Sequence, residues 1–233
     1  MISRRLFLTI TGGAILSPRL SRAANEVPSL LDHILLGCHD LDRGIAFVEE
    51  RTGVRAAFGG VHPGRGTRNA LVSLGERRYL EIIAPDPAQP DVADTYGLRR
   101  LTEPRLVHWA AHPGDLDAFA KKLREAGVPF KGPTPGSRKR SDGRVLSWKT
   151  LNLAEDRDGL LPFFIEWSAG SLHPSADSPK GCSLLRFEAL APDPENLSKT
   201  TATLGLDLSI AKADQPQLRA IIPGPHGQFS VAS

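Results

Sequence analysis

The feature that most constrains this chain is a pattern of strand, acidic turn and helix that occurs twice. Residues 31–42 read LDHILLGCHDLD and residues 106–117 read LVHWAAHPGDLD. In each copy a histidine, His33 or His108, stands seven residues before an Asp-Leu-Asp. The histidines are 75 residues apart, which is too long a period for a solenoid. The repeat therefore predicts two similar globular units.

Each copy continues in the same order of elements. Helices are predicted over 41–52, capped by Asp40 or Asp42 and ended by Gly53, and over 115–126, ended by Gly127. Alternating apolar segments predict further strands, and the glycine-rich stretches 59–69 and 132–143 are interpreted as loops. The strands expected here are 70–74, 78–83, 146–151 and 160–167.

A third unit begins with the strand-like segment 183–190. A helix opens at Asp193-Pro194-Glu195 and ends near Gly205, and three short strands follow. Arg186 stands where the first two units have histidine, and the last strand has no glutamate. The sequence thus predicts two modules at 30–90 and 105–168, each with a strand, a helix and two or three further strands. A third, ligand-free C-terminal module at 183–233 is expected to be structural.

The first 23 residues resemble a twin-arginine signal peptide. Ser3-Arg4-Arg5-Leu6 precedes an apolar run that is too short to span a bilayer, and Ala23 ends a plausible cleavage site. We therefore expect a protein exported to the periplasm or secreted, without a stable membrane anchor after signal cleavage.

Removal of that segment changes the charge balance. The whole chain carries a formal charge of +3, but four arginines and no acid lie in residues 1–23. The remainder has 25 basic against 26 acidic residues. Nucleic acid is therefore not expected as a partner. The two cysteines, Cys38 and Cys182, form no CxxC motif and are interpreted as unpaired thiols.

Each of the first two units also carries one glutamate in an apolar strand, Glu81 or Glu166. If a pseudo-twofold axis relates the units, His33, Glu81, His108 and Glu166 converge on one point. Two imidazoles and two carboxylates suit a divalent ion such as zinc, nickel, iron or manganese. The alternative for each residue alone is a solvated strand glutamate or a hydrogen-bonded core histidine.

With these residues in view, the chain resembles the vicinal oxygen chelate superfamily and, within it, the glyoxalase-like domain proteins. The resemblance rests on Leu31-Asp32-His33-Ile34, the glycine-rich stretch with His62 and Asn69, Tyr79-Leu80-Glu81, and residues 162–167. It implies an α+β fold in which the modules at 30–90 and 105–168 are paired βαβββ units that form a cupped mixed sheet around one metal ion. It also implies a Lewis-acid chemistry on substrates with vicinal oxygens.

The resemblance further implies that His33, Glu81, His108 and Glu166 are the metal ligands. Glu166 or Glu81 is then the base that moves a proton. A lyase or isomerase and an extradiol-type dioxygenase are both consistent with this set. Export and the third module argue against the lactoylglutathione reaction of glyoxalase I. A protein that sequesters a small molecule without turnover is the alternative function.

Three further residues are candidates for substrate binding. His62 and Asn69 lie in the glycine-rich stretch, and Trp148 could line an apolar pocket. The basic residues 138–140 and 144 are interpreted as a solvated loop, with attraction of an anionic substrate as the alternative. The expected partner is a small-molecule substrate, and the sequence leaves open whether the chain forms a homodimer.

Overall fold

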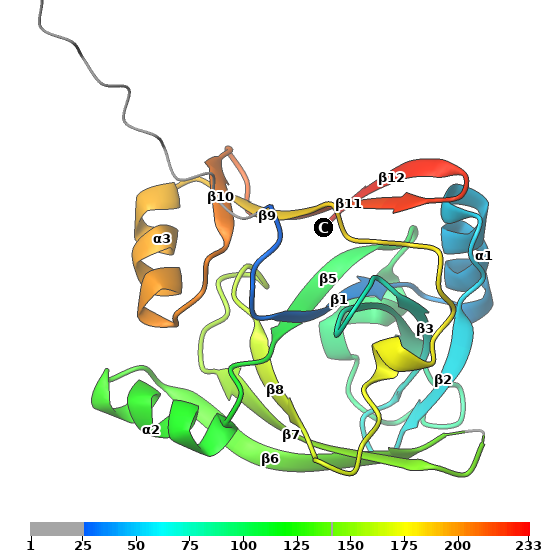
Figure 1. The fold of residues 1–233 in the computed structure, drawn as a ribbon, viewed down its shortest axis with the longest axis horizontal. Helices are drawn as coiled ribbons and strands as arrows, with labels where there is room; N and C mark the ends of the chain where they lie inside the picture. Colours follow the sequence, from blue (N-terminus) through cyan, green and yellow to red (C-terminus); the bar gives the residue numbers. More distant parts are fainter. Residues whose placement is uncertain (1–25, 141) are drawn as a thin grey trace, which may run out of the picture.

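The structure is a computed structural model that describes residues 26–140 and 142–233; the predicted signal peptide lies outside these residues. The elements form three successive units, each built as a strand, a helix and three strands (Figure 1). In chain order they are β1 (Leu31–Gly37), α1 (Leu41–Thr52), β2 (Ala57–His62), β3 (Thr67–Ser73), β4 (Tyr79–Pro85), η1 (Thr95–Arg100), β5 (Arg105–Ala111), α2 (Leu116–Glu125), β6 (Phe130–Lys139), β7 (Val145–Leu153), β8 (Phe163–Trp167), η2 (Pro174–Ala176), β9 (Arg186–Ala191), α3 (Pro194–Thr203), β10 (Ser209–Lys212), β11 (Gln217–Gly224) and β12 (Gly227–Ala232).

The first two units share one curled mixed sheet. Within the described residues it has eight strands in the order β2-β3-β4-β1-β5-β8-β7-β6. β1 and β5 pair antiparallel at its centre, and each is flanked by its parallel partner, β4 or β8. From the centre outward, each unit therefore contributes its first, last, third and second strand in the same order. This arrangement confirms the α+β fold with paired βαβββ modules, and the sheet curls into a half-barrel (Figure 1).

The helices begin and end where their sequence signals predict. Asp40 and Asp115 cap α1 and α2 by accepting hydrogen bonds from the backbone N–H groups of Arg43 and Ala118. Gly53 ends α1 in the left-handed conformation, with φ of 78°. Such aspartate caps stabilise a helix by about 1 kcal/mol each, so the two repeated acidic turns fix where both helices start.

Two segments that the sequence predicted as loops are strands. β2 contains Gly59 and Gly60, and β6 contains Gly132, Pro133, Pro135 and Gly136. Both strands lie at the edges of the eight-stranded sheet, where one side needs no ladder partner and proline and glycine are tolerated. Propensity alone therefore could not identify them.

The third unit repeats the order of elements but not their pairing. In its sheet, β10-β9-β11-β12, the first strand pairs in parallel with the strand directly after the helix. In the first two units the first strand pairs in parallel with the last strand of the unit. The third unit is thus a separate second sheet.

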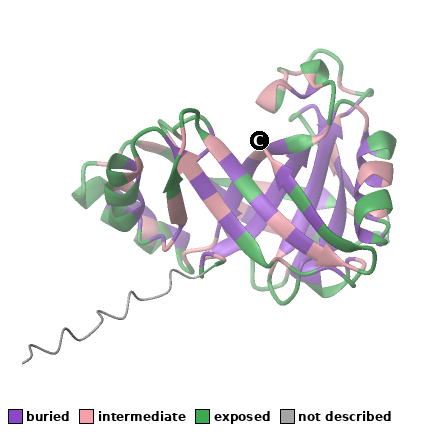
Figure 2. Cartoon of the chain, turned by 90° about the horizontal axis from the view of Figure 1, so that it is seen from above, coloured by how far each residue is buried: buried purple, intermediate pink, exposed green. Residues whose placement is uncertain are grey.

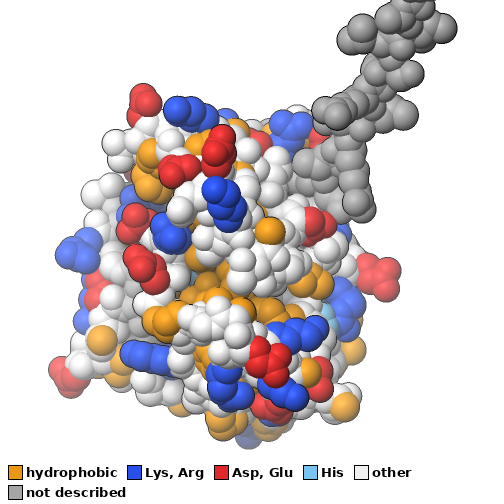
Figure 3. All heavy atoms as spheres, turned by 90° about the vertical axis from the view of Figure 1, so that its left-hand side faces the viewer, with side chains coloured by type: hydrophobic (Ala, Val, Ile, Leu, Met, Phe, Trp, Pro, Cys, Tyr) orange, Lys and Arg blue, Asp and Glu red, His pale blue; other side chains and the backbone are white. Residues whose placement is uncertain are grey.

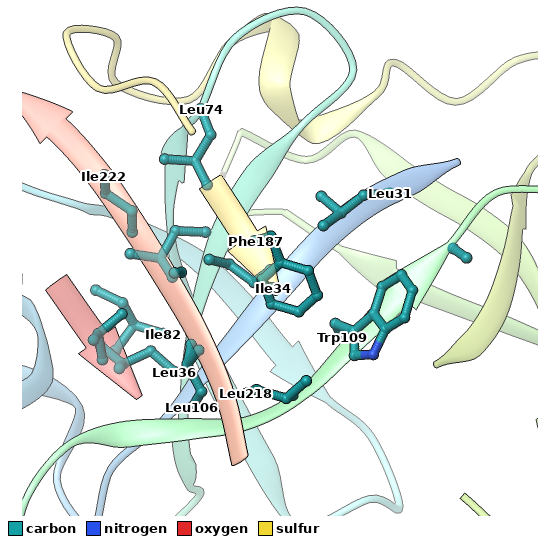
Figure 4. Close-up of a cluster of buried hydrophobic side chains, with 14 of the residues drawn as sticks. Leu31, Ile34, Leu36, Leu74, Ile82, Leu106, Trp109, Phe187, Leu218 and Ile222 are labelled. Atoms are coloured by element: carbon teal, nitrogen blue, oxygen red, sulfur yellow. The ribbon is translucent and has the colours of Figure 1, made fainter. Parts of the chain in front are cut away.

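This second sheet packs against the convex face of the first. Phe187, Leu218 and Ile222 are buried against Ile34 and Trp109 in one continuous core (Figure 4). Along β1, at the centre of the first sheet, every residue is buried, whereas burial alternates along β9 of the second sheet. The helices present their exposed faces outward (Figure 2). The concave face of the half-barrel is consequently the side available for a site.

The space-filling view of the α2 and α3 side shows apolar side chains on the floor of a hollow (Figure 3). Val128, Leu153, Leu161 and Leu204 line a groove there. In residues 26–140 and 142–233, none of the helices is long and apolar enough to cross a membrane.

Candidate active site

A pocket of about 370 Å³ opens in the concave face of the half-barrel. The first unit supplies most of its polar side chains and the second unit supplies most of its apolar wall. The lining residues are His33, Leu35, His62, Gly64, Arg65, Thr67, Asn69, Tyr79, Glu81, Ile83, Val92, Ala93, Thr95, Tyr96, Arg138, Trp148, Thr150, Phe163, Ile165 and Trp167.

A β-bulge in β1 positions the polar end of this pocket. Leu31 pairs with Ala111 and His33 with Ala110, so Asp32 is one residue in excess of the ladder. A bulge re-aims the side chains beside it. Leu31 therefore joins the core on the convex face (Figure 4). Asp32 turns to the side of His33 and bonds its ring. Simple strand alternation, which puts Leu31 and His33 on one face, is wrong at this position.

Asp32 is the centre of a buried polar cluster. Its carboxylate accepts hydrogen bonds from His33 Nδ1 at 2.7 Å, His173 Nε2 at 3.2 Å and Trp167 Nε1 at 3.2 Å. His173 Nδ1 accepts from the backbone N–H of Ser175, which leaves the proton of the neutral ring on Nε2. Burial raises the pKa of Asp32, but the hydrogen bonds of His173 and His33 outweigh it and hold that pKa below its ordinary value.

The cluster fixes the orientation of His33. Because Nδ1 donates to Asp32, Nε2 of the neutral ring is the free acceptor, and it faces the pocket. Tyr79 stacks on the imidazole, with ring centroids 4.4 Å apart and 16° between the planes. A carboxylate behind a histidine is the arrangement that orients metal-binding and catalytic imidazoles.

Glu81 faces His33 across the floor of the pocket. Its Oε2 lies 3.4 Å from His33 Nε2, and its Oε1 accepts a 2.6 Å hydrogen bond from Asn69 Nδ2. His62 Nε2 lies 3.8 Å from Oε1. Glu81 is 6 % exposed. Its carboxylate is therefore buried, with Oε1 bonded to Asn69 and Oε2 directed toward His33.

His62 lies beside Glu81 in β2, not in a flexible loop. Its Nδ1 is 2.9 Å from the hydroxyl of Thr67. Burial lowers the pKa of His62, while Glu81 opposes that shift and Arg138 and Arg65 add to it. The lowered pKa favours a neutral ring at neutral pH.

The opposite wall is apolar and aromatic. Phe163, Ile165 and Trp167 follow one face of β8, and Trp148 packs on Trp167 with ring centroids 5.5 Å apart. The three predicted substrate-binding residues, His62, Asn69 and Trp148, all line the pocket.

His108 does not join His33 and Glu81. Its Nδ1 accepts the backbone N–H of Trp109, and its Nε2 lies 3.3 Å from Asp156. The hydrogen bond from His108 holds the pKa of Asp156 below its ordinary value. The ring of Phe163 lies between the two histidines. Its centroid is 5.5 Å from that of the His33 ring and 5.6 Å from that of the His108 ring.

Glu166 lies on the other face of the sheet. Its Oε2 accepts a 2.7 Å hydrogen bond from the backbone N–H of Leu116, the first residue of α2. A carboxylate at a helix N-terminus is stabilised by the unpaired N–H groups and by the helix dipole. Its position indicates a capping role for Glu166.

The strand register explains this asymmetry. Glu81 pairs with Leu35, two residues after His33. Two residues after His108 is Ala110, and its partner on β8 is Phe163. Phe163 therefore occupies the place of the second carboxylate, and Glu166, three residues later, points to the opposite face.

The four-residue metal centre expected from the sequence is therefore not assembled. The described residues contain no group of three or more His, Cys, Asp or Glu side chains placed to hold one ion. His33 Nε2 and Glu81 Oε2 do fit as a pair, since their separation of 3.4 Å matches two donors about 2.1 Å from a tetrahedral ion. The structure thus offers half of the expected donor set.

Sequence reasoning did not identify Asp32 or His173 as parts of the site. The position of Asp32 depends on the bulge in β1, and His173 lies 141 residues from its partner. Arg138 was interpreted mainly as part of a solvated loop, with attraction of an anionic substrate as the alternative, yet it is 4 % exposed and donates to Asn69 Oδ1 at 3.3 Å. The only local signal was a basic residue among glycines and prolines.

The fold agrees with what comparisons with known proteins show. The family model described as "Glyoxalase-like domain" matches residues 31–205. No curated protein matches the chain. A hypothetical protein from Staphylococcus aureus, of known crystal structure, is 18 % identical, with 86 % of this chain and 84 % of that chain covered and a TM-score of 0.61.

Two methylmalonyl-CoA epimerases are also similar. The complex with methylmalonyl-CoA and NH4+ is 27 % identical over 60 % of this chain and 96 % of that chain, with a TM-score of 0.44. The Mycobacterium tuberculosis enzyme is 21 % identical over 59 % and 85 %, with a TM-score of 0.41. With the family model covering both modules of the half-barrel, the chain belongs to the glyoxalase-like domain family of the vicinal oxygen chelate superfamily.

Proposed function

We propose that this protein is an enzyme that moves a proton on a small substrate with adjacent oxygens. The observation that carries the proposal is the buried carboxylate of Glu81, held by Asn69 at Oε1 and open to the pocket at Oε2 beside His33. A carboxylate in such a site is a general base for a carbon acid next to a carbonyl group. The reaction class is thus a lyase or an isomerase.

Each polar group then has a role in the transfer. Glu81 Oε2 takes the proton from the carbon, and the bond electrons move onto the neighbouring carbonyl oxygen to give an enolate. His33, oriented by Asp32, lies next to that oxygen's expected position and hydrogen-bonds it when protonated. Asn69 keeps the carboxylate in place, and the aromatic wall excludes water, which strengthens both interactions. Glu81 then delivers the proton to the former carbonyl carbon, while the proton of the neighbouring hydroxyl group passes to the enolate oxygen through His33, and this completes an isomerisation.

The test is solvent-deuterium exchange. The full chain is incubated in D₂O with small α-hydroxy and α-oxo carbonyl compounds, and loss of the C–H signal is followed by NMR. We expect exchange that depends on Glu81. Tight binding of a compound without any exchange would instead favour the alternative of a sequestering protein.

As an alternative to the protonated His33, we propose that a divalent ion, zinc, nickel, iron or manganese, is held by His33 Nε2 and Glu81. When bound it supplies Lewis-acid polarisation of the substrate's oxygens. The protein is treated with a chelator, and separate samples are reloaded with one of the four ions. Elemental analysis should then find about one ion per chain in at least one sample. His33→Ala should lose the ion, and the double variant His108→Ala/Glu166→Gln should keep it; loss of the ion in both variants would support the four-ligand centre.

Export is also a proposal, because the signal lies outside the described residues. In a bacterial host with a twin-arginine pathway, we expect mature protein beginning near Ala24 outside the cytoplasm. Replacement of Arg4 and Arg5 by lysine should retain the precursor inside. N-terminal sequencing of both fractions checks this, and unprocessed wild-type protein found only in the cytoplasm would rule it out.

A further inference from the structure

Arg138 is a buried cation whose neighbours do not account for its charge. It lies near the end of β6, lines the pocket and is 4 % exposed. Its hydrogen bond goes to a neutral amide oxygen, Asn69 Oδ1 at 3.3 Å. Among the described residues, Glu81 acts on Arg138 through electrostatic attraction without a direct hydrogen bond. A buried charge is costly unless it is paired.

The nearby arginines of the same hairpin are different. Arg140 and Arg144 both pair with Asp177, at 3.1 and 2.6 Å, and lie outside the pocket. A guanidinium carries five N–H donors, and Asn69 takes one from Arg138. Arg138 therefore has N–H donors left for a ligand, whereas Arg140 and Arg144 are already paired with the carboxylate of Asp177.

The backbone of β2 leaves room for this guanidinium. A Cβ on Gly59 would lie 2.8 Å from Arg138 Nη1, and one on Gly60 would lie 3.0 Å from it. Gly60 has φ of 144°, which side-chain-bearing residues rarely adopt. Two consecutive glycines thus let Arg138 of one edge strand lie against the other edge strand, inside the pocket.

The side chains that line the pocket carry more positive than negative charge. The charged ones are Arg138, Arg65 at the exposed β2–β3 turn, and Glu81. Asp32, buried behind His33, adds a second carboxylate outside the lining. The positive charge is therefore local to Arg138 and Arg65, where it attracts anions.

We propose that the substrate carries an anionic oxygen group, a carboxylate or a phosphate, that binds Arg138 next to the reacting carbon. This inference rests on the proposed function and specifies its substrate class. Asn69 links the two groups, because it accepts from Arg138 and donates to Glu81 at 2.6 Å. The anion therefore binds one side chain away from the base, as a small 2-oxo or 2-hydroxy acid requires. Arg65 guides the anion from the mouth of the pocket.

The test compares pairs of probes that differ only in charge. Pyruvate, lactate and glycolate are titrated into the full chain by calorimetry beside their methyl esters, with inorganic phosphate as a separate arm. We expect at least one acid to bind about tenfold or more tightly than its ester, the size of one charge-assisted hydrogen bond. Phosphate binding stronger than that of every acid identifies a phosphate substrate.

Variants assign the preference to Arg138. Arg138→Gln should remove the difference between acid and ester, and Arg138→Lys should restore part of it. Arg144→Gln, which removes one surface charge, should leave it unchanged. Thermal melts show whether each variant is folded. The comparison of acid and ester binding by the wild-type chain tests the proposal even if a variant does not fold.

Each result separates this inference from the proposed function. Equal binding of every acid and its ester, with no phosphate binding, overturns the anion site even if Glu81-dependent exchange occurs. Charge-selective binding that persists in Arg138→Gln also overturns it. Charge-selective binding through Arg138 without exchange supports the anion site and removes the proton-transfer function.

Discussion

Glu81→Gln should lower the rate of solvent-deuterium exchange by about 10²–10⁴-fold, the usual contribution of a general base. The amide keeps the shape of the side chain and loses the basic oxygen that faces His33. Because the Oε1 of a glutamine can still accept the hydrogen bond from Asn69 Nδ2, the fold should be retained. The rate is measured by NMR on the purified full chain at saturating substrate.

Glu166→Gln is the matched control. The two glutamates are equivalent in the sequence repeat, but Glu166 caps α2 on the opposite face of the sheet. We expect an unchanged exchange rate and a loss of about 0.5–1 kcal/mol in the free energy of unfolding, as for a weakened helix N-terminus. A similar loss of exchange in both variants would restore the twofold site and contradict the arrangement described above.

Asp32→Ala should reduce the free energy of unfolding by about 3–5 kcal/mol, because it leaves the groups that now bond the carboxylate without a buried partner. Those groups are the two imidazoles of His33 and His173 and the indole N–H of Trp167. Without Asp32 the imidazole of His33 is no longer held in one orientation, so the rate of solvent-deuterium exchange should fall by about 10–100-fold. Urea denaturation followed by tryptophan fluorescence gives the stability.

Asp156→Ala offers the comparison for this effect. Asp156 also pairs with a histidine, His108 at 3.3 Å, but its side chain is 49 % exposed. An exposed pair of this kind contributes about 0–1 kcal/mol, so the loss should be small and exchange unchanged. Equal destabilisation by the two variants would show that the Asp32 cluster has no special role.

The sequence was sufficient for the architecture because its signals are local and repeated. Asp40, Asp115 and Asp193 each accept a hydrogen bond from the N–H three residues later, and the helices begin where these caps stand. Apolar alternation located most strands of both sheets. The edge strands β2 and β6 were missed because glycine and proline carry no strand signal of their own.

The site was predicted only in its first half. His33 and Glu81 were identified from their strands, and the structure brings them within 3.4 Å of each other. His62, Asn69 and Trp148 were identified as well and line the same pocket. The second half failed because the spacing of a residue within an apolar segment does not reveal which face of the sheet it occupies.

The sequence by itself determined the paired modules, the positions of the helices and the two residues at the floor of the pocket, since these depend on caps, periodicity and repetition along the chain. The tertiary structure alone decided that Asp32 turns toward His33, that Phe163 takes the place of a second carboxylate, and that Arg138 reaches Asn69 from the opposite edge of the sheet. Those outcomes depend on a bulge, on strand register and on the closing of the half-barrel, which arise only when distant strands pair.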